Sequence, residues 1–133
     1  MKHGTVPTFH MKGMERDMEQ IEKITVAQLR GIADRIFGNM VKADVDIARK
    51  LIVIDAELHA DIEQFMLDNG SCQDDLWGIN LYPDQYGSPD FIEFDSMINI
   101  KPQQGNRSRF VEDGGKREKI TEIVNEVIVG DKS

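Results

Sequence analysis

The stretch LWGINLYPDQYGSPDFIEFDSMINIKPQQGNRSR, from Leu76 to Arg109, decides much of the fold. Residues 76–82 and 91–101 alternate apolar with polar side chains, and a period of two is typical of strands with one buried face. The turn-rich residues 83–90 separate these two strands. The stretch then ends in a polar loop, residues 103–109, which has no apolar residue. Core packing does not account for that composition, so the loop is a candidate functional segment.

Two further strands are predicted before this stretch. In residues 41–47, apolar side chains alternate with Lys42, Asp44 and Asp46, which indicates a strand with one wet face. Residues 50–56 follow, with Ala48-Arg49 as the candidate turn. This second strand is apolar on both faces, a composition typical of a strand in the middle of a sheet.

Three helices are predicted around these strands. Thr25 and Gln28 form a capping-box pattern that opens the first helix, and Gly38 favours its end. An acidic residue, Asp55 or Glu57, opens the second helix, and Asp113 opens the third. The helices have these apolar stripes: Leu29, Ile32, Ala33, Ile36 and Phe37; Leu58, Ile62, Phe65 and Met66; and Ile120, Ile123, Val124, Val127 and Ile128.

The order helix, strand, strand, helix, strand, strand, helix predicts an α+β fold. We expect a mostly antiparallel sheet of about four strands with three helices packed on one face. The other face would carry the acidic side chains in water. Residues 16–130 are expected to form one domain after a flexible tail, residues 1–15. Met14, Met18 and Ile21 lie at helical spacing, and a short edge strand at residues 20–24 is the alternative.

Composition limits the classes of function. The chain has 133 residues, a net charge of −8 and one cysteine, Cys72, which fits a reducing cytoplasm. It lacks the roughly 20-residue apolar run of a membrane span and the apolar core of a signal peptide. Nucleic-acid binding depends on Lys and Arg contacts to phosphates, so the acidic balance disfavours it.

Three segments resemble a known family. They are VKADVDIARKLIVIDAELHADIE, DDLWGINLYP and FIEFDSMINIKPQQGNRSR, and the resemblance covers roughly residues 21–129. The chain resembles a family of small bacterial and archaeal proteins catalogued as a domain of unknown function. The resemblance therefore implies no activity, substrate or catalytic residue. The chain departs from the family's pattern at Gly114-Gly115, where a Pro is expected after Asp113, and this departure predicts a looser helix start.

The polar loop is the first candidate site. Its Gln103, Gln104, Asn106, Arg107 and Arg109 could bind an anionic ligand or the acidic side chain of a partner. The loop lacks the glycine spacing of a phosphate-binding P-loop. The competing interpretation is structural, because such amides and guanidinium groups also satisfy backbone carbonyls and nearby acids.

Acid–base catalysis is the second candidate. His59, with Asp61 and Asp95, could move protons while Arg107 or Arg109 holds an anionic substrate. No hydroxyl or thiol nucleophile is adjacent in sequence, and a solvated helix face is the favoured explanation for His59 and Asp61.

A divalent-cation site is the third candidate, and it would use the carboxylates expected on the outer sheet face: Asp44, Asp46, Glu93 and Asp95. The same face could instead be wet, or could be covered in a homodimer. No cofactor motif is present. The sequence thus favours a non-catalytic binding module that acts on an anionic ligand or an acidic partner, with an enzyme as the alternative.

Overall fold

A six-stranded mixed sheet forms the middle layer of the structure, a computed structural model that describes residues 8–12, 17–21, 23–56 and 58–131. In spatial order its strands are β2 (Asp17–Ile21), β1 (Thr8–Lys12), β5 (Leu51–Ala56), β4 (Val41–Asp46), β6 (Leu76–Leu81) and β7 (Ile92–Glu93). Strands β5, β4, β6 and β7 are antiparallel, whereas β1 runs parallel to β5. A second, two-stranded sheet pairs β3 (Ile24–Thr25) with β8 (Ile128–Val129) in parallel. The predicted α+β class with a mostly antiparallel sheet is confirmed.

Three helices connect these strands in the predicted order: α1 (Val26–Ile36), α2 (His59–Asp68) and α3 (Gly114–Val127). The predicted capping box opens α1, because the Thr25 hydroxyl accepts from Gln28 N and the Gln28 amide accepts from Thr25 N. Gly38 has a φ of 90° after the end of this helix, as expected. None of the described helices is long and apolar enough to cross a membrane.

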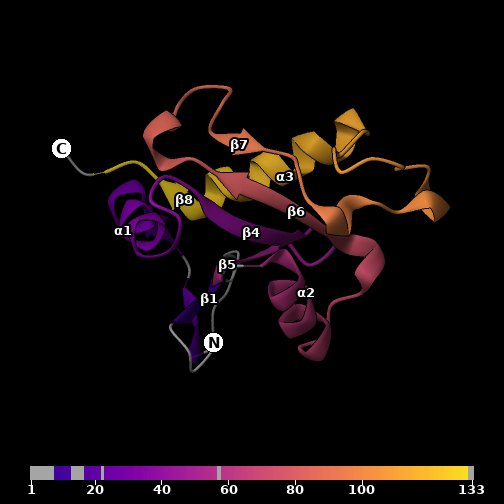
Figure 1. Cartoon of the computed structure of the whole chain (residues 1–133), viewed down its shortest axis with the longest axis horizontal. Helices are drawn as coiled ribbons and strands as arrows, with labels where there is room; N and C mark the ends of the chain where they lie inside the picture. Colours follow the sequence, from indigo (N-terminus) through magenta and orange to yellow (C-terminus); the bar gives the residue numbers. More distant parts are fainter. Residues whose placement is uncertain (1–7, 13–16, 22, 57, 132–133) are drawn as a thin grey trace.

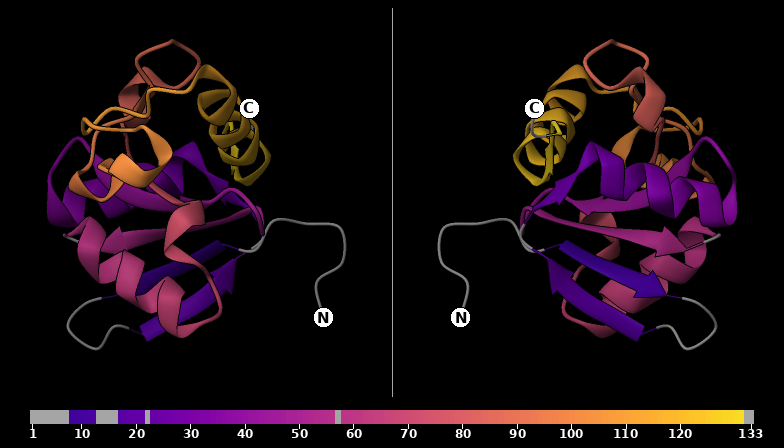
Figure 2. Two further views of the ribbon diagram at one scale, coloured as in Figure 1. Left: turned by 90° about the vertical axis from the view of Figure 1, so that its right-hand side faces the viewer. Right: turned by 90° about the vertical axis from the view of Figure 1, so that its left-hand side faces the viewer.

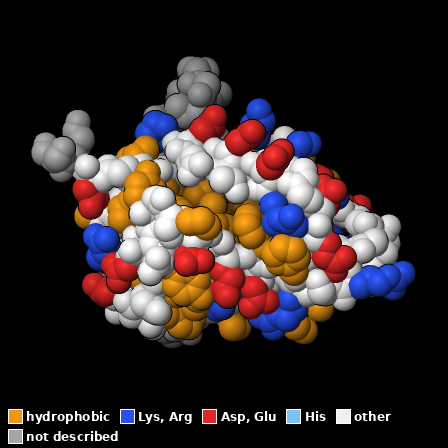
Figure 3. Space-filling model, turned by 90° about the horizontal axis from the view of Figure 1, so that it is seen from above, with side chains coloured by type: hydrophobic (Ala, Val, Ile, Leu, Met, Phe, Trp, Pro, Cys, Tyr) orange, Lys and Arg blue, Asp and Glu red, His pale blue; other side chains and the backbone are white. Residues whose placement is uncertain are grey.

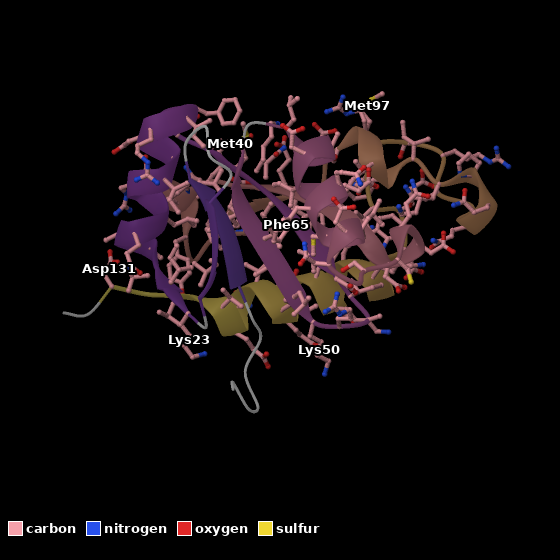
Figure 4. The ribbon with its side chains drawn as sticks, turned by 90° about the horizontal axis from the view of Figure 1, so that it is seen from below. Lys23, Met40, Lys50, Phe65, Met97 and Asp131 are labelled. Carbon is pink, nitrogen blue, oxygen red and sulfur yellow. The ribbon has the colours of Figure 1, made fainter. Side chains whose placement is uncertain are left out.

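The helices cover both faces of the sheet, so the predicted packing of all three on one face is wrong. Helices α1 and α3 share one core cluster with Val45 and Ile54, whereas Ile62 and Met66 of α2 pack on Leu51 and Val53 from the opposite side. Figure 1 shows α3 above the sheet and α2 below it, and Figure 2 places β1 and β2 at the end far from α3. Figure 4 shows α2, with Phe65 labelled, lying over the lower face.

The acidic face is therefore not wet along β4, which corrects a second expectation, although Glu93 is exposed. Asp44 and Asp46 do point away from the main core, as the alternation along β4 predicts. Both side chains are 0 % exposed, however, because α2 lies over this face. A buried carboxylate needs a hydrogen-bonding partner, so the covered face contains polar contacts rather than solvent.

The fourth predicted strand is much shorter than residues 91–101. Strand β7 contains only Ile92 and Glu93, and the chain then forms a 3-10 helix at Met97–Asn99. A regular alternation through residues 91–101 would turn Asn99 and Lys101 toward solvent, but the two residues are 0 % and 2 % exposed. The Asn99 side chain accepts from Gly78 N and donates to Gly78 O, so it occupies the place of a neighbouring strand.

Details near the helix starts also differ from expectation. Leu58 was assigned to the buried stripe of α2, but it precedes the helix and is 58 % exposed. The predicted opening of α2 by Asp55 or Glu57 is wrong, because the N-cap residue is Leu58, which makes no side-chain capping hydrogen bond. Asp55 lies in β5, and Glu57 is outside the described residues. Strands β2 and β3 support the strand interpretation of the segment before α1, and β1 lies within residues 1–15, of which 1–7 and 13–15 are outside the described residues.

Candidate functional site

A buried Asp–His pair lies between the sheet and α2. The Oδ1 of Asp44 on β4 is 2.8 Å from Nδ1 of His59, the first residue of α2. Asp44 is fully buried and His59 is 9 % exposed. The alternation along β4 turns Asp44 toward α2, and the first residue of α2 lies against it. Residues 15 positions apart in sequence therefore come into contact.

Gly78 makes room for this pair. It lies opposite Asp44 in the β4–β6 ladder. A Cβ atom at this position would lie 2.9 Å from His59 Nδ1 and 2.5 Å from Ser96 Cβ, which is too close for real atoms. The imidazole ring and Ser96 therefore occupy the space that any other residue at position 78 would fill.

A chain of hydrogen bonds leads from the pair to the surface. His59 Nε2 is 3.0 Å from Asn80 Oδ1, and Asn80 Nδ2 donates to Glu93 Oε1 at 2.9 Å and to Asp95 O at 3.3 Å. Tyr82 donates its hydroxyl proton to the same Glu93 oxygen at 2.8 Å. Tyr82 and the exposed Glu93 line an open cavity of about 340 Å³. We call Asp44, His59, Asn80, Tyr82 and Glu93 the polar network.

The surroundings raise the pKa of two groups of the polar network, Asp44 and Tyr82. Burial raises the pKa of Asp44 from 3.8 to about 6, while its hydrogen bond and attraction to His59 act in the opposite direction. Repulsion from Glu63 adds to the rise, and the charge of Lys101 opposes it. Burial and the Glu93 carboxylate raise the pKa of Tyr82 to about 12, so Tyr82 remains a hydrogen-bond donor at neutral pH.

Two buried carboxylate oxygens near the pair make no hydrogen bond within the described part of the chain: Asp44 Oδ2 and Glu63 Oε2. Lys101 lies close enough to influence both carboxylates, but its ammonium donates to the carbonyls of Gln73 and Ile98. Burial lowers the pKa of Lys101. No local pattern singles out Lys101 or Asn99, because a regular strand alternation turns both side chains toward solvent.

The arrangement does not form a nucleophile triad. Both ring nitrogens of His59 are already engaged, by Asp44 and by Asn80. The buried Ser96 hydroxyl lies near the ring but accepts from Ile98 N in its own turn. Of the other predicted acid–base residues, Asp61 lies in the first turn of α2, and Asp95 meets the polar network only through its backbone oxygen.

Each of the four predicted metal ligands hydrogen-bonds to a different partner. Asp46 accepts from Ala48 N, Arg49 N and the Ser71 hydroxyl, so it caps the turn between β4 and β5. Asp44 meets His59, Glu93 meets Asn80, and Asp95 meets Arg109. Among the described residues, no three His, Cys, Asp or Glu side chains are placed to hold a metal ion.

Asn106 organises the predicted ligand-binding loop. Its side-chain amide donates to the carbonyls of Asn99, Ser108 and Phe110, and its carbonyl oxygen accepts from Glu112 N. Gly105, directly before it, takes the left-handed conformation, with a φ of 80°. The buried Asn106 side chain therefore fixes the path of the chain from residue 99 to residue 112.

Glu112 fixes the same loop from outside. Its Oε2 accepts from Arg107 N, Ser108 N and the Ser108 hydroxyl. These hydrogen bonds, led by the Ser108 hydroxyl, hold the pKa of Glu112 below its ordinary value. The remaining loop amides are also engaged, since Gln103 and Gln104 both donate to Asp74.

Four consecutive exposed residues project from this fixed loop, and we call Arg107, Ser108, Arg109 and Phe110 the recognition ridge. Arg109 donates to both carboxylate oxygens of Asp95, at 2.6 and 3.3 Å, and is still 51 % exposed. The Arg107 guanidinium makes no hydrogen bond to any described residue. Phe110 is 47 % exposed, and the Arg117 guanidinium lies 4.8 Å from its ring centroid.

One family model matches most of the chain. A family described as a protein of unknown function (DUF5674) matches residues 19–127. No curated protein and no solved structure matches the chain.

Proposed function

This chain belongs to the DUF5674 family, and we propose that it is a non-catalytic binding module that recognises an anionic group on a partner with the recognition ridge. This proposal rests on the buried Asn106 amide, whose four hydrogen bonds hold four consecutive exposed residues in one conformation.

Pre-organisation supports this role. A loop that is ordered before binding loses less conformational entropy when a partner arrives. The recognition ridge is held from inside by Asn106 and from outside by Glu112, through hydrogen bonds of 2.7 to 3.1 Å. Core packing alone would not need two independent supports for a surface loop.

The side chains of the ridge suit an anion with an apolar neighbour. Arg107 presents an unoccupied guanidinium fork, which matches a carboxylate or phosphate in two hydrogen bonds. Phe110 lies three residues later and supplies an exposed ring, and Arg and aromatic side chains are the residues enriched at binding hot spots. The acidic chain as a whole repels anions, so binding depends on contact within this loop.

A hollow beside the ridge extends the surface. An open cavity of about 730 Å³ lies between Phe94 and the first turns of α3, and the rings of Phe94 and Phe110 meet edge to face with centroids 6.4 Å apart. Figure 3 views the molecule from the α3 side and shows apolar side chains among acidic and basic ones on this face. An apolar side chain next to the partner's anionic group would fit there.

Nuclear magnetic resonance titration tests this proposal with two defined probes, inorganic phosphate and a short peptide that contains glutamate and phenylalanine. We expect backbone amide shifts concentrated at residues 107–110, larger for the peptide than for phosphate. Arg107→Gln should abolish them. Lys50→Gln is the matched control, because it removes one exposed cation from the turn between β4 and β5 (labelled in Figure 4). Shifts that are absent, or that both variants reduce equally, contradict the proposal.

A further inference from the structure

The orientation of the Asn80 amide can be decided from its neighbours. One end of this amide faces two acceptors, Glu93 Oε1 and the Asp95 carbonyl, at 2.9 and 3.3 Å. Only the NH₂ group can donate to both, so the amide oxygen must face His59. An amide oxygen cannot donate, and His59 Nε2 lies 3.0 Å from it. His59 must therefore carry a proton on Nε2.

This assignment leaves a second proton to account for. With Nε2 protonated, neutral imidazole has a lone pair on Nδ1, and that lone pair would face the lone pairs of Asp44 Oδ1 at 2.8 Å. The contact is attractive only if a proton lies between the two atoms. We infer that Asp44 and His59 share one buried proton, and that this proton holds the start of α2 to β4, while Asn80 and Glu93 extend the link to β6 and β7. The inference does not depend on the proposed binding function.

Loss of the shared proton would break the polar network by either available route. If Nε2 keeps its proton, Nδ1 and Asp44 repel each other. If the remaining proton moves to Nδ1, the bare Nε2 faces the Asn80 oxygen, and turning that amide would set its oxygen against Glu93 and Asp95 O. Each route loses hydrogen bonds that join β4, α2, β6 and β7.

The charged groups around the pair come from every element packed on it. Glu63 approaches Asp44 from α2 and favours the protonated pair, whereas Lys101 approaches from the segment after the 3-10 helix Met97–Asn99 and favours proton loss. Glu93 of β7 acts through Asn80, and it attracts the NH₂ end that keeps the amide in place. The proton thus acts as a pH-sensitive link, here called the latch, between α2 and β4.

Nitrogen-15 magnetic resonance of the histidine side chains tests the latch directly. Full-length protein is titrated from about pH 4 to about pH 9, which brackets the ordinary pKa values of carboxyl and imidazole groups. His59→Gln assigns the His59 signals against those of His3 and His10. We expect a single step as pH rises, in which the His59 signals and the backbone amides of α2 and β7 shift together, and a proton on Nε2 on the acidic side of that step. A bare Nε2 on the acidic side of the step, or a His59 titration that leaves those amides unchanged, overturns the inference.

Asp44→Asn gives an independent test. Its NH₂ group can donate to Nδ1 of neutral His59, so the contact forms without a shared proton. We expect Nε2 to stay protonated and the step at α2 and β7 to disappear. Asp46→Asn is the matched control, because Asp46 is also fully buried on the same face of β4 but caps a turn instead. The step should persist in that variant. A step that survives Asp44→Asn overturns the inference.

Discussion

Gly78 on β6 lies directly opposite Asp44 on β4, and its missing side chain leaves the space that the His59 ring and Ser96 fill. This relationship links a backbone position to the chemistry of the buried pair. A strand residue without a side chain ordinarily weakens a sheet. Here the glycine allows α2 to bring His59 against the sheet.

Gly78→Ala should therefore destabilise the protein by about 1–3 kcal/mol, the usual cost of overpacking a close-packed interior. The added Cβ would meet Ser96 Cβ at 2.5 Å and His59 Nδ1 at 2.9 Å. The free energy of unfolding in urea measures the effect. Gly31→Ala is the control, because nothing lies within 4 Å of its added Cβ in α1, and it should stabilise by about 0.5–1 kcal/mol. Equal effects of the two variants would contradict the steric argument.

The Asp44 carboxyl should make stability fall as pH rises. Burial raises its folded pKa from 3.8 to about 6, so its contribution is fully present below 3.8 and is lost as pH passes through about 6. A shift of about two units corresponds to at most about 3 kcal/mol. Unfolding of the native protein and Asp44→Asn at pH values on both sides of this window isolates the effect. The stability of Asp44→Asn relative to the native protein should increase with pH, and a difference that stays constant would refute the assignment.

Asn106→Ala should cost about 3 kcal/mol, because it leaves buried carbonyls without donors. Asn106→Asp should be at least as harmful, since a carboxylate cannot donate to the carbonyls of Asn99, Ser108 and Phe110. Hydrogen exchange at residues 107–110 should accelerate in both variants. Asn125→Ala, at an exposed position on α3, should change the free energy of unfolding by less than about 0.5 kcal/mol. Unchanged exchange in the Asn106 variants would mean that other contacts hold the ridge.

The Arg109–Asp95 ion pair should contribute little to stability. Both side chains are substantially exposed, at 51 % and 41 %, so solvent screens their attraction. A double-mutant cycle with Arg109→Gln and Asp95→Asn should give a coupling energy close to zero, which high salt reduces further. A larger, salt-insensitive coupling would show that the pair is part of the structural core.

The sequence predicted the elements whose periodicity is local. The capping box at Thr25 and Gln28 and the alternation along β4 both follow from short-range geometry, and both are confirmed. The presence of a helix on the second face of the sheet could also have been predicted. Residues 51–54 are apolar on both sides of β5, and such a strand needs a cover on each side, which α2 supplies.

The buried pair could be predicted only in part. The sequence identified His59 and Asp44 as chemically interesting, but no local pattern indicates that they touch, because α2 must first lie over β4. The short β7 was missed for a related reason. Alternation continues through residues 94–101, yet Asn99 satisfies the edge of β6 with its side chain and the backbone turns away.

The Asn99 amide has a consequence for self-association. It engages both the N–H and the carbonyl of Gly78 that point away from β4, at 2.8 and 3.0 Å. An incoming strand from a second copy would find no unpaired backbone group at this point of the border and would have to displace a buried side chain first. Strand pairing with a second copy is thus blocked at this point of β6.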